Sequence, residues 1–272
     1  MKTNHTFWTD TNVPFVEMRF TRQSAESYKA HSHREFCVGA VTEGTTLTTI
    51  REKSYAVSPG FLVLIDPELV HSCNPQVGRV RSYIMAYFDV QWCHSLQEAL
   101  FGKQEKLISP KTALLESDVL FHSLIELASL LPSDALPLEK TENLTQFVGD
   151  LFLRTCDLAV AKLDTEPYGI IHEVKKYLKQ QSEIKITLEE LSATFRCNPY
   201  HLLRNFKKIV GLPPHAFMLN ARIERAKGLL LDGVPLAAVA AETGFVDQSH
   251  FHKTFCRILA ATPRQYQQRS RK

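Results

Sequence analysis

Residues 187–210 read TLEELSATFRCNPYHLLRNFKKIV, and this stretch decides the fold of the C-terminal part of the chain. Thr187 followed three residues later by Glu190 forms a capping box, which predicts the start of a helix. The letters RCN indicate a short turn, and Pro199 suits the first turn of the next helix because no N–H is needed there. Two short helices joined by a tight turn, with a basic second helix, are typical of a helix-turn-helix unit.

The same pattern recurs about 48 residues later, in PLAAVAAETGFVDQSHFHKTFCRIL at 235–259. Gly244 supplies a turn residue that can adopt a positive φ. Between the two units, PHAFMLNARIERAKGLLLDG at 214–233 is predicted to be one long helix. A rigid connecting helix can hold two recognition helices at a fixed spacing, so that each enters a successive major groove.

Charge is distributed unevenly along the chain. Tyr168–Lys272 contains 17 Lys or Arg and 8 Asp or Glu, whereas Met1–Pro167 contains 15 basic and 21 acidic residues. The asymmetry indicates that only the C-terminal part meets a polyanion. Charge alone is equally compatible with a solvated basic surface.

Residues 170–269 resemble the DNA-binding domain of the AraC/XylS family of bacterial transcription regulators. The resemblance is carried by LEELSATFRCNPYHLLRNFKKIVGLPPHAF, ARIERAKGLLLDG and AAETGFVDQSHFHKTFCRILAATPRQYQ. It implies that Tyr200 and Arg204 face bases in the first recognition helix, and that Gln248, Ser249 and Lys253 do so in the second.

Leu203 lies on or near the predicted solvent-facing side of this helix, so we expect it among the base-contacting residues. We expect phosphate contacts from Asn198, Lys207, Lys208 and Arg257. Two positions depart from the family pattern, Cys256 where Lys is usual and Ala260 where Gly is usual. His250 is expected to pack internally.

Residues 15–90 are predicted to form short strands, including FCVGAV, TTLTTI, FLVLID and RSYIMAYFDV. Turn formers separate them at roughly ten-residue spacing, which is typical of an all-β barrel or sandwich. Two amphipathic helices follow, at 112–131 and 138–163, and form a helical hairpin that either covers the barrel or mediates dimerisation. The segment 164–169 is predicted to be the linker to the C-terminal domain.

The stretch HSHREFC at 31–37 carries potential ligands on one face if it is a strand, because alternate side chains point the same way. His71 follows 38 residues after His33. The order H-x-H, PG, P-x-x-x-H resembles the two motifs of a cupin barrel. Metal-binding cupins have a carboxylate where Cys37 or Val38 stands, so we expect no metal. Should a metal bind, the candidate ligands are His31, His33, Cys37 and His71, a set that Zn²⁺ accepts.

The resemblance to AraC/XylS regulators implies a sensor barrel that binds a small organic effector. The candidate effector-binding residues are His31, His33, Cys37, His71 and Cys73. The stretches HSCNP and YIMAYFDVQWC resemble a subset of the family associated with exporters, which implies an amino acid or another small metabolite as effector. Three alternatives stay open: hydrogen-bonded barrel histidines without a ligand, a metal-dependent cupin enzyme, and a metal or thiol redox sensor using Cys37 and Cys73.

The sequence therefore predicts an α+β protein. A cupin-like barrel at about 15–90 and a helical hairpin at about 112–163 make up a sensing and dimerisation domain at 1–163. An all-α domain with two helix-turn-helix units follows at 170–272. We expect a non-enzymatic, homodimeric transcription regulator, an activator, with duplex DNA, RNA polymerase and a small effector as partners and no cofactor. Without an apolar leader, a membrane span or a C-x-x-C pair, the chain is expected in the cytoplasm.

Overall fold

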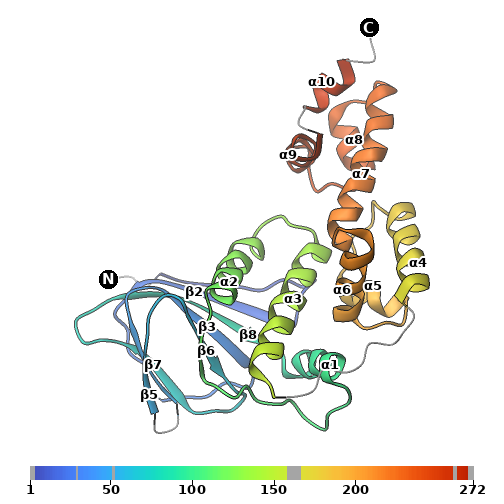
Figure 1. Cartoon of the computed structure of the whole chain (residues 1–272). Helices are drawn as coiled ribbons and strands as arrows, with labels where there is room; N and C mark the ends of the chain where they lie inside the picture. Colours follow the sequence, from blue (N-terminus) through green and yellow to red (C-terminus); the bar gives the residue numbers. More distant parts are fainter. Residues whose placement is uncertain (1–3, 29, 51–52, 158–166, 260–261, 269–272) are drawn as a thin grey trace. The chain divides into compact units, whose positions relative to one another are not determined.

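The computed structural model describes residues 4–28, 30–50, 53–157, 167–259 and 262–268 (Figure 1). The fold is α+β, as predicted, with a β-rich N-terminal part and a helical C-terminal part. Two compact units make up the chain. The first comprises Met1–Ser133 and Asn143–Lys162, and the second comprises Asp134–Glu142 and Leu163–Lys272. No helix in the described ranges has the length and apolar character needed to cross a membrane.

The first unit is built on two antiparallel sheets. The larger has the strand order β1-β2-β8-β3-β6-β9, and the smaller has the order β5-β4-β7. The bounds are β1 Asn4–Trp8, β2 Val16–Ser24, β3 Phe36–Glu43, β4 Thr46–Ile50, β5 Lys53–Val57, β6 Phe61–Ile65, β7 His71–Pro75, β8 Arg81–Phe88 and β9 Leu114–Glu116.

Apolar side chains from both sheets meet in one core inside the first unit. Val41 and Met85 come from the larger sheet and Ile50 from the smaller one. Cys37 is fully buried in the same cluster. Strand alternation explains this layer, since every second side chain of a strand faces the opposite sheet.

Helix α1 (Val90–Phe101) was not predicted from the sequence. The Asp89 side chain accepts a hydrogen bond from the Trp92 N–H at 2.8 Å and caps the helix. An Asp before an apolar run is a recognised N-cap signal. It was hidden by the β-rich stretch that ends directly before it.

The predicted helix at 112–131 begins later than expected. Leu114–Glu116 instead form β9, with Leu114 opposite Val63 at the edge of β6. Ser117 then accepts a hydrogen bond from the Leu120 N–H, and α2 runs over Asp118–Leu130. Leu114 and Leu115 have helical spacing with the residues that follow, but a free strand edge competes for their backbone groups.

The second helix of the hairpin, α3, spans Pro137–Thr155. The helix was predicted to continue to residue 163, but it ends at Thr155, and Cys156 and Asp157 are not helical. Residues 158–163 and the linker residues 164–166 lie outside the described residues. Pro167–Gly169, predicted to be linker, form the first turn of α4 (Pro167–Gln180). Proline is well suited to that first turn.

Helices α5 to α10 follow among the described residues of the second compact unit, and they include both predicted helix-turn-helix units. The first helix-turn-helix unit consists of α5 (Leu188–Thr194) and α6 (Pro199–Val210). The second helix-turn-helix unit consists of α8 (Leu236–Glu242) and α9 (Gln248–Leu259). The connecting helix α7 spans Pro214–Leu231, and α10 spans Pro263–Gln268. The predicted capping box is present, with reciprocal hydrogen bonds between Thr187 and Glu190.

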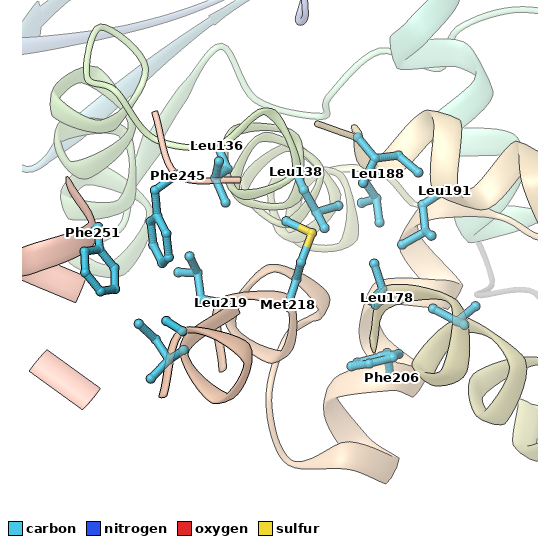
Figure 2. Packing of buried hydrophobic residues seen from close by; sticks show 14 of the residues in the cluster. Leu136, Leu138, Leu178, Leu188, Leu191, Phe206, Met218, Leu219, Phe245 and Phe251 are labelled. Atoms are coloured by element: carbon cyan, nitrogen blue, oxygen red, sulfur yellow. The ribbon is translucent and has the colours of Figure 1, made fainter. Parts of the chain in front are cut away.

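The segment Asp134–Glu142, which the sequence places in the N-terminal domain, packs within the second unit. Leu136 and Leu138 belong to its apolar core, beside Phe245 and Met218 (Figure 2). Thr141 Oγ1 accepts a hydrogen bond from the Leu188 N–H at 2.8 Å, at the start of α5. This segment is therefore part of the helix-turn-helix core.

Candidate nucleic-acid interface and sensor cavity

Helix α6 presents a basic face to solvent. Arg204, Lys207 and Lys208 are exposed, and Phe206 is fully buried on the opposite side. The Asn198 side chain caps the helix by accepting hydrogen bonds from the N–H groups of Tyr200 and His201. Guanidinium and ammonium groups on one exposed helical face are suited to base edges and phosphates.

Two of the predicted base readers on α6 are buried. Leu203 is 4% exposed and belongs to the apolar core, so its expected base contact is wrong. Tyr200 is also 4% exposed, which withdraws its side chain from the solvent-facing surface. Asn198 was expected to contact phosphate, yet its side-chain oxygen is engaged as the helix cap. Among the α6 residues of the predicted set, Arg204, Lys207 and Lys208 have exposed side chains.

Helix α9 presents a second polar face. The predicted residues Gln248, Ser249 and Lys253 are exposed, as is Arg257 one turn after Lys253. Phe251 and Phe255 are fully buried on the other side. The faces of α6 and α9 are thus equivalent positions of two repeated units.

His250 packs inward, as the sequence predicts. Its ring lies 5.4 Å from the Phe245 ring, and its N–H donates to Asp247 Oδ1 at 2.6 Å. Burial lowers the pKa of His250, and the nearby Arg222 adds to this shift. His250 is therefore a neutral packing residue at neutral pH. Of the two departures from the family pattern, Cys256 is half-buried on α9, and Ala260 lies outside the described residues.

The first unit contains a cavity lined by residues of both of its sheets. Four of the five predicted effector-binding residues line it, namely His31, His33, His71 and Cys73. His31 and His71 are joined by two backbone hydrogen bonds of 2.9 and 2.8 Å. Because β3 begins only at Phe36, His31 and His33 reach the cavity from the segment before the strand and not by strand alternation.

The three histidines form a compact cluster. Their ring centroids are 4.7–5.1 Å apart, and one ring nitrogen from each lies within 4.8 Å of the others. Burial lowers the pKa of His33 and of His71, and the neighbouring imidazoles lower both further. His71 Nδ1 lies 2.9 Å from the Leu69 carbonyl, which can only accept, so Nδ1 carries the proton. The lone pair of His71 is therefore on Nε2.

The fifth predicted residue, Cys37, does not line the cavity. Its side chain packs in the apolar core of the first unit, and its Sγ lies 3.5 Å from the Glu35 carbonyl. Burial raises the pKa of the Cys37 thiol, and it also raises the pKa of Cys73. Both groups are therefore thiols and not reactive thiolates at neutral pH, which argues against sensing through an activated cysteine.

Sequence reasoning missed the charged and aromatic part of the cavity. Arg19 from β2 and Arg81 from β8 line it together with Tyr83 and Tyr87. The alternation of Arg81, Tyr83 and Tyr87 along β8 is the signal that could have revealed this face. Among the residues that the structure describes, no Asp or Glu lines the cavity, so its wall is cationic.

Known protein families match both the N-terminal and the C-terminal part of the chain. Residues 14–148 match the family model of the AraC-like ligand binding domain, and residues 191–269 match that of a helix-turn-helix domain. The HTH-type transcriptional regulator YbfI of Bacillus subtilis is 30% identical over 232 residues, which cover 83% of this chain and 82% of YbfI. The chain belongs to the AraC family of transcriptional regulators.

Two further similarities extend over nearly the whole of this AraC-family chain. LumQ of Photobacterium leiognathi, a probable transcriptional regulator, is 23% identical over 91% of the chain and 94% of its own length. The crystal structure of ToxT from Vibrio cholerae covers 98% of the chain and 96% of ToxT, with 14% identity and a TM-score of 0.39. The two family models and the similarity to YbfI confirm the predicted family, ligand-binding domain and DNA-binding domain.

Proposed function

We propose that this AraC-family regulator reads DNA through Arg204 on α6 and through Gln248, Ser249 and Lys253 on α9. The observation that carries the proposal is the exposure of these side chains on equivalent faces of the two units. Lys207, Lys208 and Arg257 would neutralise phosphates and fix the register on the duplex. The chain would act in the cytoplasm by binding and not by catalysis.

The cavity of the first unit would bind the effector. An effector that binds one conformational state more tightly shifts the population towards that state. We propose that this shift changes how the two DNA-binding units of a homodimer engage their half-sites, with α2 and α3 as the dimerisation surface and RNA polymerase as a partner.

Duplex selection from a random pool followed by salt-dependent affinity measurements tests the DNA-binding proposal. With several Lys and Arg at phosphates, log affinity should fall linearly with log salt, by about 0.9 per phosphate neutralised. Selection of no sequence, or an affinity independent of salt, would contradict it.

A metal-sensing role is the second candidate, because the three cavity histidines lie close together and His71 has its proton fixed on Nδ1. A carbonyl partner on the second ring nitrogen is the usual arrangement of a metal-ligating histidine. Zn²⁺ titration by calorimetry tests it. His71→Ala should abolish binding, whereas His122→Ala, on the exposed face of α2, should leave it unchanged. Equal affinity of both variants would remove this candidate.

A further inference from the structure

Two arginine side chains, Arg19 and Arg81, line the cavity of the first unit, and no described residue gives either of them an acidic partner. Arg81 is 1% exposed, and its Nη1 and Nη2 donate to the carbonyls of Glu26 and Cys73 at 3.1 and 2.7 Å. Arg19 donates from Nη2 to the Tyr28 hydroxyl at 2.7 Å. In the described part of the chain, neither guanidinium lies within salt-bridge distance of a carboxylate.

Several donors at this cavity lack an acceptor. Arg19 Nε and Arg81 Nε are buried without a hydrogen-bond partner, and so is the Thr46 hydroxyl. All three residues line the same cavity. A buried donor without a partner costs about 1–3 kcal/mol, and more when the group is charged. A ligand that brings acceptor oxygens to these atoms would recover this free energy.

The charges around the cavity favour a negatively charged ligand. A buried charge needs a counter-charge, and the described cavity wall supplies two cations and no anion. Guanidinium groups bind carboxylates through charge-assisted hydrogen bonds.

The remainder of the wall suits an apolar body. The rings of Tyr28, Tyr83 and Tyr87 line the cavity together with Val63 and Met85. The guanidinium carbons of Arg19 and Arg81 lie 5.2 Å from the Tyr28 ring centroid and 5.0 Å from the Tyr83 ring centroid, respectively. The charged and aromatic groups are therefore adjacent, so one small molecule can contact both.

From these contacts we propose that the effector is a small organic carboxylate with an apolar or aromatic body and no ammonium group. The proposal rests on the proposed sensor role of the cavity and deepens it. An amino acid, which the sequence suggests, would place its ammonium group beside two guanidiniums without a carboxylate to bind it.

Three matched probes test the ligand class on the full chain by isothermal titration calorimetry. They are 3-phenylpropionate, its neutral amide 3-phenylpropionamide, and phenylalanine, which adds only an ammonium group. We expect the carboxylate to bind at least about tenfold more tightly than either other probe, as the loss of one charge-assisted hydrogen bond implies. Equal or tighter binding of the amide or of phenylalanine overturns the proposal, as does the absence of carboxylate binding at millimolar concentrations.

Arg19→Gln tests the residue assignment without touching the more deeply buried Arg81. Carboxylate affinity should fall about tenfold or more, while the affinity for the amide stays unchanged. The matched control is Arg22→Gln, which removes an exposed positive charge from the same strand outside the cavity. Equal effects of the two substitutions overturn the assignment.

DNA affinity measured on the same samples distinguishes a failure of the effector proposal from a failure of the proposed DNA-binding function. If Arg19→Gln binds selected DNA like the unsubstituted chain and no probe prefers a carboxylate, only the effector class fails. If DNA binding is absent in the unsubstituted chain, the proposed function fails independently of the calorimetry.

Discussion

Arg222 on α7 donates a hydrogen bond from Nη1 to the carbonyl of Gly244, in the turn of the second helix-turn-helix unit. Its Nε and Nη2 donate to the carbonyls of Ser182 and Ile184, at 2.6 and 2.9 Å, directly before the first unit. Arg222 is fully buried, and burial lowers its pKa to about 10. One guanidinium thus binds the backbone that precedes the first helix-turn-helix unit and the turn within the second one.

Replacing this guanidinium should destabilise the second compact unit, which contains both helix-turn-helix units. Arg222→Met leaves three buried carbonyls without their donor, so we expect the free energy of unfolding to fall by about 3 kcal/mol or more. Urea denaturation followed by circular dichroism measures this. The matched control is Arg225→Met on the same helix, since the exposed Arg225–Glu183 ion pair should contribute less than about 1 kcal/mol. Similar losses in both variants would refute the structural role of Arg222.

Gly244 should tolerate no side chain. It has a φ of +79°, and an added Cβ would lie 2.5 Å from the Glu183 carbonyl oxygen. Gly244→Ala is therefore expected to cost more than the roughly 1–2 kcal/mol of a left-handed residue without such a contact. Gly211→Ala is the control, because Gly211 has a φ of +83° and no neighbour within 4 Å of the added Cβ. Thermal denaturation compares the two, and equal shifts in Tm would show that the contact with Glu183 is unimportant.

His215 and Glu142 should make the stability of the second unit depend on pH. The Glu142 carboxylate accepts from both the backbone N–H and the ring Nδ1 of His215, and Glu139 lies 3.7 Å from the other ring nitrogen. Although burial opposes the charged imidazolium, these carboxylates raise the pKa of His215; Arg257 opposes them weakly. Burial also raises the pKa of Glu142, which the hydrogen bond from His215 partly offsets.

A raised pKa in the folded state gives stability that is fully present below the unfolded pKa and is lost as pH rises through the folded value. The stabilisation contributed by His215 should therefore decrease from about pH 6.5 upwards. We expect Glu142→Gln to lower the His215 pKa, measured by NMR titration of its ring protons. An unchanged or higher titration midpoint would show that Glu142 does not hold the proton on His215.

Arg204→Ala should change sequence preference. A bidentate guanidinium–guanine contact contributes about 1–3 kcal/mol of discrimination at one base position. Lys207→Ala is the comparison, since loss of a phosphate contact weakens binding to all sequences and reduces the salt slope by about 1. Binding to single-base operator variants distinguishes the two. An equal loss of affinity for all operator variants in Arg204→Ala would show that Arg204 contacts a DNA phosphate and not a base.

Local signals explain why the helix-turn-helix units were predictable. The capping box of Thr187 and Glu190, the first-turn Pro199 and the turn glycine Gly244 act within a few residues of themselves, so the sequence displays them directly. The failures come from competition with tertiary structure. Leu114 pairs with Val63 at the edge of β6 and is not helical, and Leu203 packs in the core although it was predicted on or near the solvent-facing side of α6.

The sequence by itself determined the family, the order of a β-rich sensor part and a helical DNA-binding part, and the positions of the two helix-turn-helix units. Only the tertiary structure decided what the cavity contains. Sheet pairing brings His71 to His31 and Arg81 to Arg19, and it turns Cys37 into the core. These placements depend on strand register and burial between distant segments, which a local pattern does not encode.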